Sequence, residues 1–232
     1  MELKMNYDNM SCGDLVRFAK TRNDYSDKKL NIYEFTDKSF YRVDEIKNLK
    51  IINQSGFGLI ISRKNNRYKN CSVHFTNYRK TSGGNIVIKR TPHLINDLVI
   101  YSNTRNCGLA VGENFSCVGA RIFLYEDKKV CIGKDNQWSF QILIRTSDSH
   151  AILDSAGNCI NKGGDVIIGE HVWLAAQVRI LKGVSIAKGC IVGCGSIVTK
   201  TFTDENVIIV GTPAKIVKRN ITWSRKPPED FY

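Results

Sequence analysis

The chain has no long apolar run. Nowhere in its 232 residues do roughly 18 uncharged apolar residues follow one another, which is the length that a membrane-spanning helix requires. The first residues, Met1 to Asp8, also lack the apolar core of a secretory signal peptide. We therefore expect no membrane span and no export signal, and the cytoplasm is the expected location.

Metal-site and disulfide patterns are absent as well. The eight cysteines are scattered and include no C-x-x-C pair and no zinc-site spacing. In a chain without an export signal, reduced thiols packed as small apolar groups are favoured over disulfides. We expect no bound metal.

The basic residues form no signature of nucleic-acid binding. The formal net charge of +12 concentrates anions near the surface. The lysines and arginines are nevertheless spread along the chain, and Lys215 to Arg219 is the only tight cluster near a motif. Anionic small molecules or anionic glycans fit this charge, and we expect no nucleic-acid partner.

What the chain does contain is a repeat with a period of six residues. Large aliphatic residues recur at this interval: Ile168, Leu174, Ile180, Ile186, Val192 and Val198. A second line lies two residues earlier: Val166, Val172, Val178, Val184, Cys190 and Ser196. A third line, mostly of small residues, lies one residue later: Gly169, Ala175, Leu181, Ala187, Gly193 and Thr199. An α-helix cannot use this pattern, because six residues advance about 600° and the apolar line would walk around the cylinder.

The repeat predicts an all-β fold, a parallel β-helix with three short strands in each coil. The two aliphatic lines point inwards and the third line lies at the corners. On an eighteen-residue coil, Ile168 lies over Ile186, Leu174 over Val192, and Ile180 over Val198, with coils about 4.8 Å apart. Inward pairs such as Ile86 and Ile88 continue the pattern upstream in irregular early coils.

The organisation predicted from these patterns has three parts. Residues 1–50 form a small N-terminal cap, in which Ser11 begins a short helix that shields the open end of the solenoid. Residues 51–203 form the β-helix, and residues 204–232 form a C-terminal extension that packs on it. A loop near residues 149–164 is rich in turn residues, has no six-residue line and is extruded between coils.

The motifs resemble those of a known family. The repeat from Ile168 to Lys200, followed by Gly-Thr-Pro-Ala at 211–214, is similar to the hexapeptide-repeat acyltransferases. Residues 146–152 (TSDSHAI), Ile160-Asn161 and residues 171–174 (HVWL) resemble the capsular polysaccharide O-acetyltransferases, including the polysialic acid O-acetyltransferases. The segment at 220–226 is also similar to theirs.

The resemblance implies a left-handed winding, a homotrimer with a groove between subunits, and acetyl transfer from acetyl-CoA to a sugar hydroxyl of a bacterial surface polysaccharide, with sialic acid as one acceptor. It also places the general base at His150, since a neutral histidine can take the hydroxyl proton. Asp148 either fixes the tautomer of that ring or makes a turn. Trp173 lines the cleft, and its backbone N–H is available for the thioester oxyanion.

Coenzyme A requires a narrow groove for its pantetheine arm and cations for its phosphates. The corner residues Ala175, Ala176 and Gly193 would let the arm approach backbone amides, and Thr199 lies on the same line of small residues. The cations expected near the phosphates are Lys200 and Lys218, together with Lys215 and Arg219.

Other hypotheses about function and mechanism remain open at this point. A covalent route through Cys194 is conceivable, although nothing in the sequence activates that thiol. A metal-dependent carbonic anhydrase on the same scaffold needs a close pair of histidines, and the four histidines (His74, His93, His150 and His171) provide none. A glycan-binding scaffold without catalysis is a third reading, and an acetyltransferase of a small sugar or amino sugar is a fourth.

Overall fold

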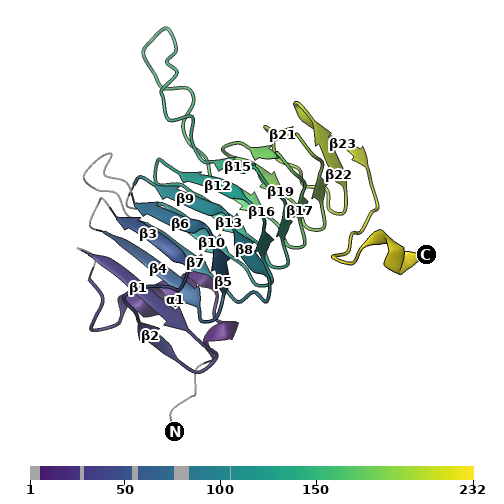
Figure 1. The fold of residues 1–232 in the computed structure, drawn as a ribbon. Helices are drawn as coiled ribbons and strands as arrows, with labels where there is room; N and C mark the ends of the chain where they lie inside the picture. The colour runs from purple at the N-terminus through teal and green to yellow at the C-terminus, as the bar shows by residue number, and fades with distance from the viewer. Residues whose placement is uncertain (1–5, 27–28, 54–56, 76–83, 105) are drawn as a thin grey trace.

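The computed structural model describes residues 6–26, 29–53, 57–75, 84–104 and 106–232, and the chain winds through them as a left-handed parallel β-helix. Three sheets form the sides of a long prism, and the coils stack along its axis (Figure 1). The predicted fold class is confirmed. We number the sheets in the order in which each coil visits them.

Sheet 1 contains, in order, β2 (Phe40–Arg42), β1 (Leu30–Phe35), β4 (Gly58–Arg63), β7 (Asn85–Ile88), β10 (Gly108–Val111), β13 (Lys129–Ile132), β16 (Val166–Ile168) and β19 (Ser185–Ile186). Sheet 2 contains β5 (Arg67–Lys69), β8 (Leu94–Asn96), β11 (Ser116–Cys117), β14 (Gln137–Trp138), β17 (Trp173–Leu174), β20 (Ile191–Val192), β22 (Ile208–Gly211) and β23 (Ala214–Lys218). Sheet 3 contains β3 (Leu49–Asn53), β6 (Cys71–Phe75), β9 (Leu98–Ser102), β12 (Ala120–Leu124), β15 (Ile142–Arg145), β18 (Arg179–Ile180) and β21 (Ile197–Val198).

The six-residue repeat produces the predicted register. Ile168 pairs with Ile186, Leu174 with Val192, and Ile180 with Val198, one pair in each sheet. All six side chains are buried in one continuous apolar core that fills the prism. Each coil thus buries an aliphatic side chain on every side, which is the main favourable contribution to folding.

Small residues at the corners have a steric cause. Gly112, Gly133 and Gly169 stack at the corner between sheets 1 and 2, and a Cβ on Gly133 would lie 2.6 Å from the backbone carbon of Gly169. That contact is too close for any side chain, so the stacking of coils requires glycine there.

The N-terminal segment lies against the side of the first coils. The helices η1 (Tyr7–Asn9) and α1 (Cys12–Lys20) precede β1, and the Ser11 hydroxyl caps α1 by accepting from Asp14 N at 3.1 Å. Leu15 and Ala19 of α1 pack in a second apolar cluster, together with residues of β1, β2, β4 and β7 that face outwards from sheet 1. The helix therefore covers a face of the prism, and the parallel ladder begins at Leu30, upstream of residue 51.

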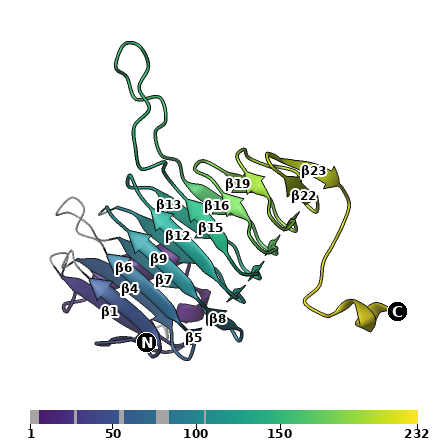
Figure 2. The same ribbon diagram turned by 45° about the horizontal axis from the view of Figure 1, so that its top comes forward.

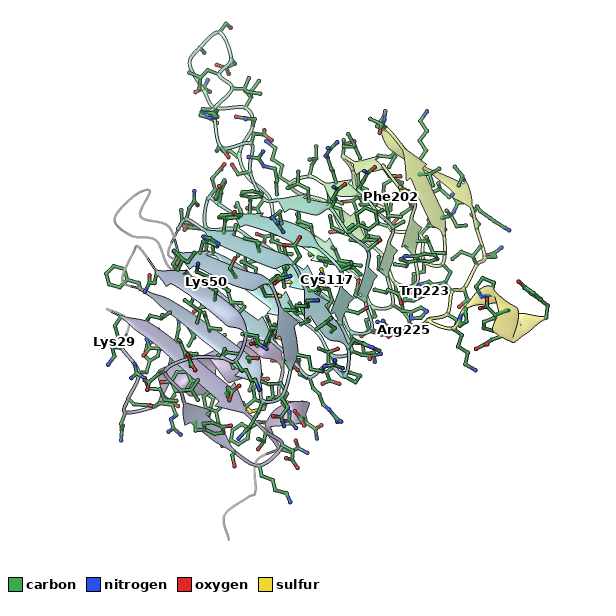
Figure 3. All side chains as sticks on the ribbon, viewed as in Figure 1. Lys29, Lys50, Cys117, Phe202, Trp223 and Arg225 are labelled. Carbon is green, nitrogen blue, oxygen red and sulfur yellow. The ribbon has the colours of Figure 1, made fainter. Side chains whose placement is uncertain are left out.

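At each end of the stack, one of the three sheets ends in an antiparallel strand. At the start, β2 pairs antiparallel with β1, and at the far end β23 pairs antiparallel with β22. Phe202 adds a parallel bridge to Ile186 and is buried over the last coil (Figure 3). After β23 the chain turns back alongside the prism and ends in η2 (Pro228–Phe231) (Figure 2). Among the described residues, none of the helices has the length and apolar character needed to cross a membrane.

Candidate active site

The segment between β15 and β16 projects far from the prism, as the predicted extruded loop (Figures 1 and 2). An antiparallel bridge between Leu153 and Cys159 makes its outer part a narrow hairpin. Its tip is apolar in part, since Ile152, Leu153 and Ile160 are 55%, 58% and 63% exposed. These three residues give the projecting loop an exposed apolar surface.

Asn161 holds the two sides of the loop together at its base. Its amide nitrogen donates to Asp148 Oδ2 at 2.9 Å and to the carbonyl oxygen of His150 at 2.8 Å. Its amide oxygen accepts from Ile152 N at 2.7 Å. Because these partners lie before and after His150, the backbone at the histidine is fixed.

Lys182, at the same prism corner in the next coil, strengthens this base. Its ammonium group pairs with Asp148 and donates to the carbonyl oxygen of Asn161 at 2.6 Å. The hydrogen bonds from Lys182 and then Asn161 hold the pKa of Asp148 below its usual range. Asp148 is therefore an anion across the neutral range.

Glu126 provides a second anchor at the foot of the loop. It accepts from the Ser147 hydroxyl and, at 2.7 Å, from Gly163 N on the returning strand of the loop. The hydrogen bonds from Ser147 and Gly163 lower the pKa of Glu126. The Ser147 hydroxyl also accepts from Ser149 N at 2.9 Å, which tightens the turn that leads to His150.

His150 itself is exposed at the start of the projecting loop. Among the hydrogen bonds of the described residues, none reaches its imidazole ring, and Asp148 is occupied by Lys182 and Asn161. Within this chain, Asp148 thus orders the loop base, while a role in fixing the tautomer of His150 stays a prediction.

Trp173 lies on the outer side of sheet 2, partly buried, next to the inward-facing Leu174. Its backbone N–H donates to the carbonyl oxygen of Cys190 at 3.0 Å as part of the ladder. The prediction that this N–H stabilises a thioester oxyanion is therefore wrong, because the coil above already uses it. A role for the indole ring stays a prediction.

Within one chain, the structure does not bring His150 and Trp173 together. His150 follows β15 at the corner between sheets 3 and 1, whereas Trp173 lies on sheet 2. In a three-sided prism that corner and that face are opposite each other. A site that uses both side chains therefore requires two copies of the chain.

The residues predicted to hold coenzyme A fall in three places. Ala175, Ala176 and Gly193 lie at the corner between sheets 2 and 3, and all three are partly buried. A Cβ on Gly193 would come within 2.5 Å of Val210 Cγ1, so packing under β22 already requires glycine there.

Thr199 and Lys200 are exposed at the same corner as the loop, in a later coil. Lys200 lines a shallow cavity of about 410 Å³ together with Lys215, which brings two of the predicted phosphate ligands to one place. Lys218 lies exposed on β23, outside that lining, and Arg219 is paired with Asp204.

Sequence reasoning missed the residues that hold the base of the loop. Asn161 stood inside the resemblance only as part of a matching segment, and Lys182 sits at an ordinary corner of the repeat. Glu126 lies in an early coil with no motif of its own. Within the described part of the chain, no group of three or more His, Cys, Asp and Glu side chains is placed to hold a metal ion. The eight cysteines are free, and Cys194 is exposed.

Comparison with known proteins identifies the relatives. A family model for the bacterial transferase hexapeptide, described as six repeats, matches residues 165–200. The chain is 38% identical over 170 residues to a polysialic acid O-acetyltransferase of Neisseria meningitidis, covering 72% of this chain and 79% of the relative. It is 39% identical over 124 residues to the enzyme of the same name from Escherichia coli O1:K1, covering 53% of this chain and 40% of that relative.

Solved structures agree on the architecture. The polysialic acid O-acetyltransferase OatWY matches with a TM-score of 0.59 and 27% identity over 89% of this chain and 97% of its own. The polySia-specific acetyltransferase NeuO matches in fold with a TM-score of 0.68 at 24% identity, over 86% of this chain and 91% of its own. The chain is an acetyltransferase and belongs to the hexapeptide-repeat O-acetyltransferases, the family of the polysialic acid enzymes that it matches.

Proposed function

We propose that this protein transfers the acetyl group of acetyl-CoA to a sugar hydroxyl of a bacterial surface polysaccharide in the cytoplasm, with His150 as the general base. The observation that carries the proposal is the construction around His150. The backbone at this residue is fixed by Asn161, while the imidazole is left exposed at the start of a projecting loop. A fixed backbone with an accessible ring is what a base requires to meet an incoming hydroxyl.

The reaction proceeds directly within a ternary complex. The imidazole takes the proton of the sugar hydroxyl as its oxygen attacks the thioester carbonyl, so that the new C–O bond forms. The C–S bond then breaks, and the imidazolium returns the proton to the departing thiolate of coenzyme A. In this route the exposed Cys194 takes no part.

We further propose that the working unit is a homotrimer with its site shared between subunits. The opposite placement of His150 and Trp173 within one prism supports this, because a second copy can present the missing half. The exposed Ile152, Leu153 and Ile160 at the loop tip supply an apolar surface for that neighbour.

Coenzyme A is proposed to lie in the groove between two subunits. The cavity lined by Lys200 and Lys215 provides two positive charges for its phosphates. The pantetheine arm would pass the small corner residues Ala175, Ala176 and Gly193. Lys218 and Thr199 are exposed at the same end of the prism and complete the proposed surface.

An anionic glycan such as polysialic acid is the proposed acceptor. The net charge of +12 supports an anionic polymer, because it raises the local concentration of such a chain. The relatives from Neisseria and E. coli are named for polysialic acid, which makes it the first acceptor to test.

The test measures acetyl transfer from acetyl-CoA to sialylated, neutral and amino-sugar glycans. We expect transfer to the sialylated polymer, and His150→Ala should lower kcat by about 10² to 10⁴ fold, as loss of a general base does. Cys194→Ala is the matched control and should retain full activity. Undiminished turnover in His150→Ala would exclude the assigned base, and a preference for neutral or amino-sugar acceptors would exclude the proposed glycan.

A further inference from the structure

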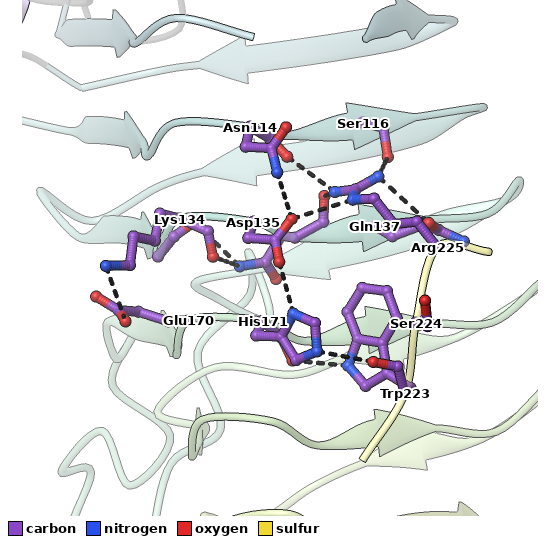
Figure 4. A network of polar contacts seen from close by, with 12 residues as sticks. Asn114, Ser116, Lys134, Asp135, Gln137, Glu170, His171, Trp223, Ser224 and Arg225 are labelled. Carbon is purple, nitrogen blue, oxygen red and sulfur yellow. Dashed lines mark hydrogen bonds and ion pairs between the residues drawn. The ribbon is translucent and has the colours of Figure 1, made fainter. Parts of the chain in front are cut away.

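The C-terminal segment from Ile221 to Arg225, which we call the strap, lies along the corner between sheets 1 and 2. It runs back toward the N-terminal coils and contacts one coil after another. Ile221 N donates to the carbonyl oxygen of Asn206 at 3.0 Å, and the indole Nε1 of Trp223 donates to that of His171 at 2.8 Å. The strap thereby ties separate coils together (Figure 4).

Arg225 anchors the end of the strap with its full donor capacity. A guanidinium carries five N–H groups, and each one here meets an acceptor. The acceptors belong to two consecutive coils: Asp135 Oδ1 at 3.0 Å, Ser116 Oγ at 2.8 Å, Gln137 Oε1 at 3.2 Å, and the carbonyl oxygens of Asn114 at 2.8 Å and Asn136 at 2.9 Å. Because all five N–H donors of Arg225 have acceptors, this side chain fixes the end of the strap in one position, which a surface ion pair does not do.

His171 contacts the middle of the strap and links it to Asp135. Its Nδ1 lies 2.6 Å from Asp135 Oδ2, and its Nε2 lies 3.1 Å from the carbonyl oxygen of Trp223. A carbonyl oxygen accepts hydrogen bonds, and so does a carboxylate, so the His171 ring faces an acceptor at each of its two nitrogens. Asp135 thus lies between this ring and the Arg225 guanidinium.

The charges around His171 support this arrangement. Burial pushes the pKa of Asp135 up, but the hydrogen bonds from His171 and Arg225 outweigh it and leave the pKa below its ordinary value. Lys134 and Glu170 pair with each other at 3.7 Å beside the cluster, so neither adds an unbalanced charge to it.

Trp223 connects the contacts of His171 and Arg225 to the proposed active site. Its ring stacks on the imidazole of His171 with centroids 4.0 Å apart and planes 9° apart, and only 8% of the residue is exposed. Its ring centroid also lies 6.1 Å from that of Trp173, with the two ring planes at an angle of 49°. The indole of Trp173 stands partly buried on the outside of a sheet, with Trp223 as an aromatic neighbour.

We propose that Trp223 is a positioning residue, which the strap holds in place so that the indole of Trp173 keeps one orientation at the active site. The effect on acetyl transfer rests on the function proposed above for Trp173, but the effect on the orientation of Trp173 does not. A strap that only stabilised the fold would leave the Trp173 ring unaffected when Trp223 alone is shortened.

The experiment follows the three indole N–H signals of the full-length protein by NMR after ¹⁵N labelling of tryptophan. In Trp223→Ala we expect the Trp173 signal to shift and broaden, and kcat to fall about tenfold with little change in KM, as misplacement of a reacting group does. The signal of Trp138, which is buried inside the prism, should stay in place. Trp223→Phe retains a ring and should restore most of both properties.

Two outcomes overturn the inference. An unmoved Trp173 signal in Trp223→Ala shows that the strap does not position that ring. Unchanged kcat in Trp223→Ala, in a protein whose His150→Ala variant is inactive, shows that the positioning has no catalytic effect although the proposed function stands. If His150→Ala keeps its activity, the proposed function fails, and the Trp173 signal still decides whether Trp223 positions the ring.

Discussion

The loop and the strap both leave the regular coils, and they are secured in opposite ways. The loop is fixed only at its base, by Asn161 and Glu126, and its apolar tip is open to solvent. The strap returns to the prism and buries Trp223 there, with Arg225 bonded to five acceptors. The contrast teaches that the Trp173 side of the proposed site is covered by its own chain, whereas the His150 side is the one that we propose a neighbouring subunit completes.

The largest expected effect comes from charging the loop tip. Leu153→Asp places an ionised group where we propose that a second subunit packs, and desolvating it there is unfavourable. We expect the trimer to dissociate in sedimentation experiments, and transfer to fall by about a hundredfold or more because each site needs two copies. Ser155→Asp adds the same charge to a polar position of the same loop and should leave assembly intact. A fully active Leu153→Asp monomer would remove the distinction between the loop and the strap.

A smaller effect is expected when the base of the loop is loosened. Asn161→Ala removes the hydrogen bonds to Asp148, to the His150 carbonyl and from Ile152 N. We expect kcat to fall about ten- to a hundredfold, since displacement of a reacting group by about 1 Å has effects of that size. The matched control is Asn158→Ala, which breaks contacts to Asp154 at the tip, and it should stay within about twofold of the native rate. Equal losses in the two variants would mean that the base has no special role.

The smallest expected effect is a dependence of the loop on acid pH. The lowered pKa values of Asp148 and Glu126 mean that their anchoring is present above about pH 4 and is lost as the pH falls through those values. We therefore expect the protection factor of the Ile152 N–H, which is corrected for the intrinsic pH dependence of hydrogen exchange, to be smaller in acid than at neutral pH. In Asp148→Asn the protection should already be reduced at neutral pH. Unchanged protection in that variant would place the anchoring elsewhere.

The late coils could be predicted residue by residue, because a six-residue period specifies both burial and register locally. Ile168 over Ile186 follows from counting alone. For the early coils the sequence predicts only inward pairs such as Ile86 and Ile88, because their strands reach six residues and their turns vary in length. For the same reason the start of the ladder at Leu30 was not visible in the repeat.

The site was predictable where a motif was compact and not where contacts span the fold. His150 and Trp173 each stand in a short recognisable segment. The engagement of Trp173 N–H by Cys190 follows from stacking, which a motif does not display. Arg225 reaches Asn114 across 111 residues of sequence, and no periodicity links the two. Asn161 acts through three partners whose proximity depends on the path of the loop.

The antiparallel strands β2 and β23 at the ends of the stack have a consequence for self-association. Parallel coils expose unpaired backbone at their last rung, and such a rung can template further chains into a growing cross-β fibre. Here β23, with Lys215 and Lys218, runs against the direction that another coil needs, and β2 does the same at the opposite end of the prism. Hindered end-to-end stacking is consistent with the side-by-side trimer that we propose, a closed assembly and not an open filament.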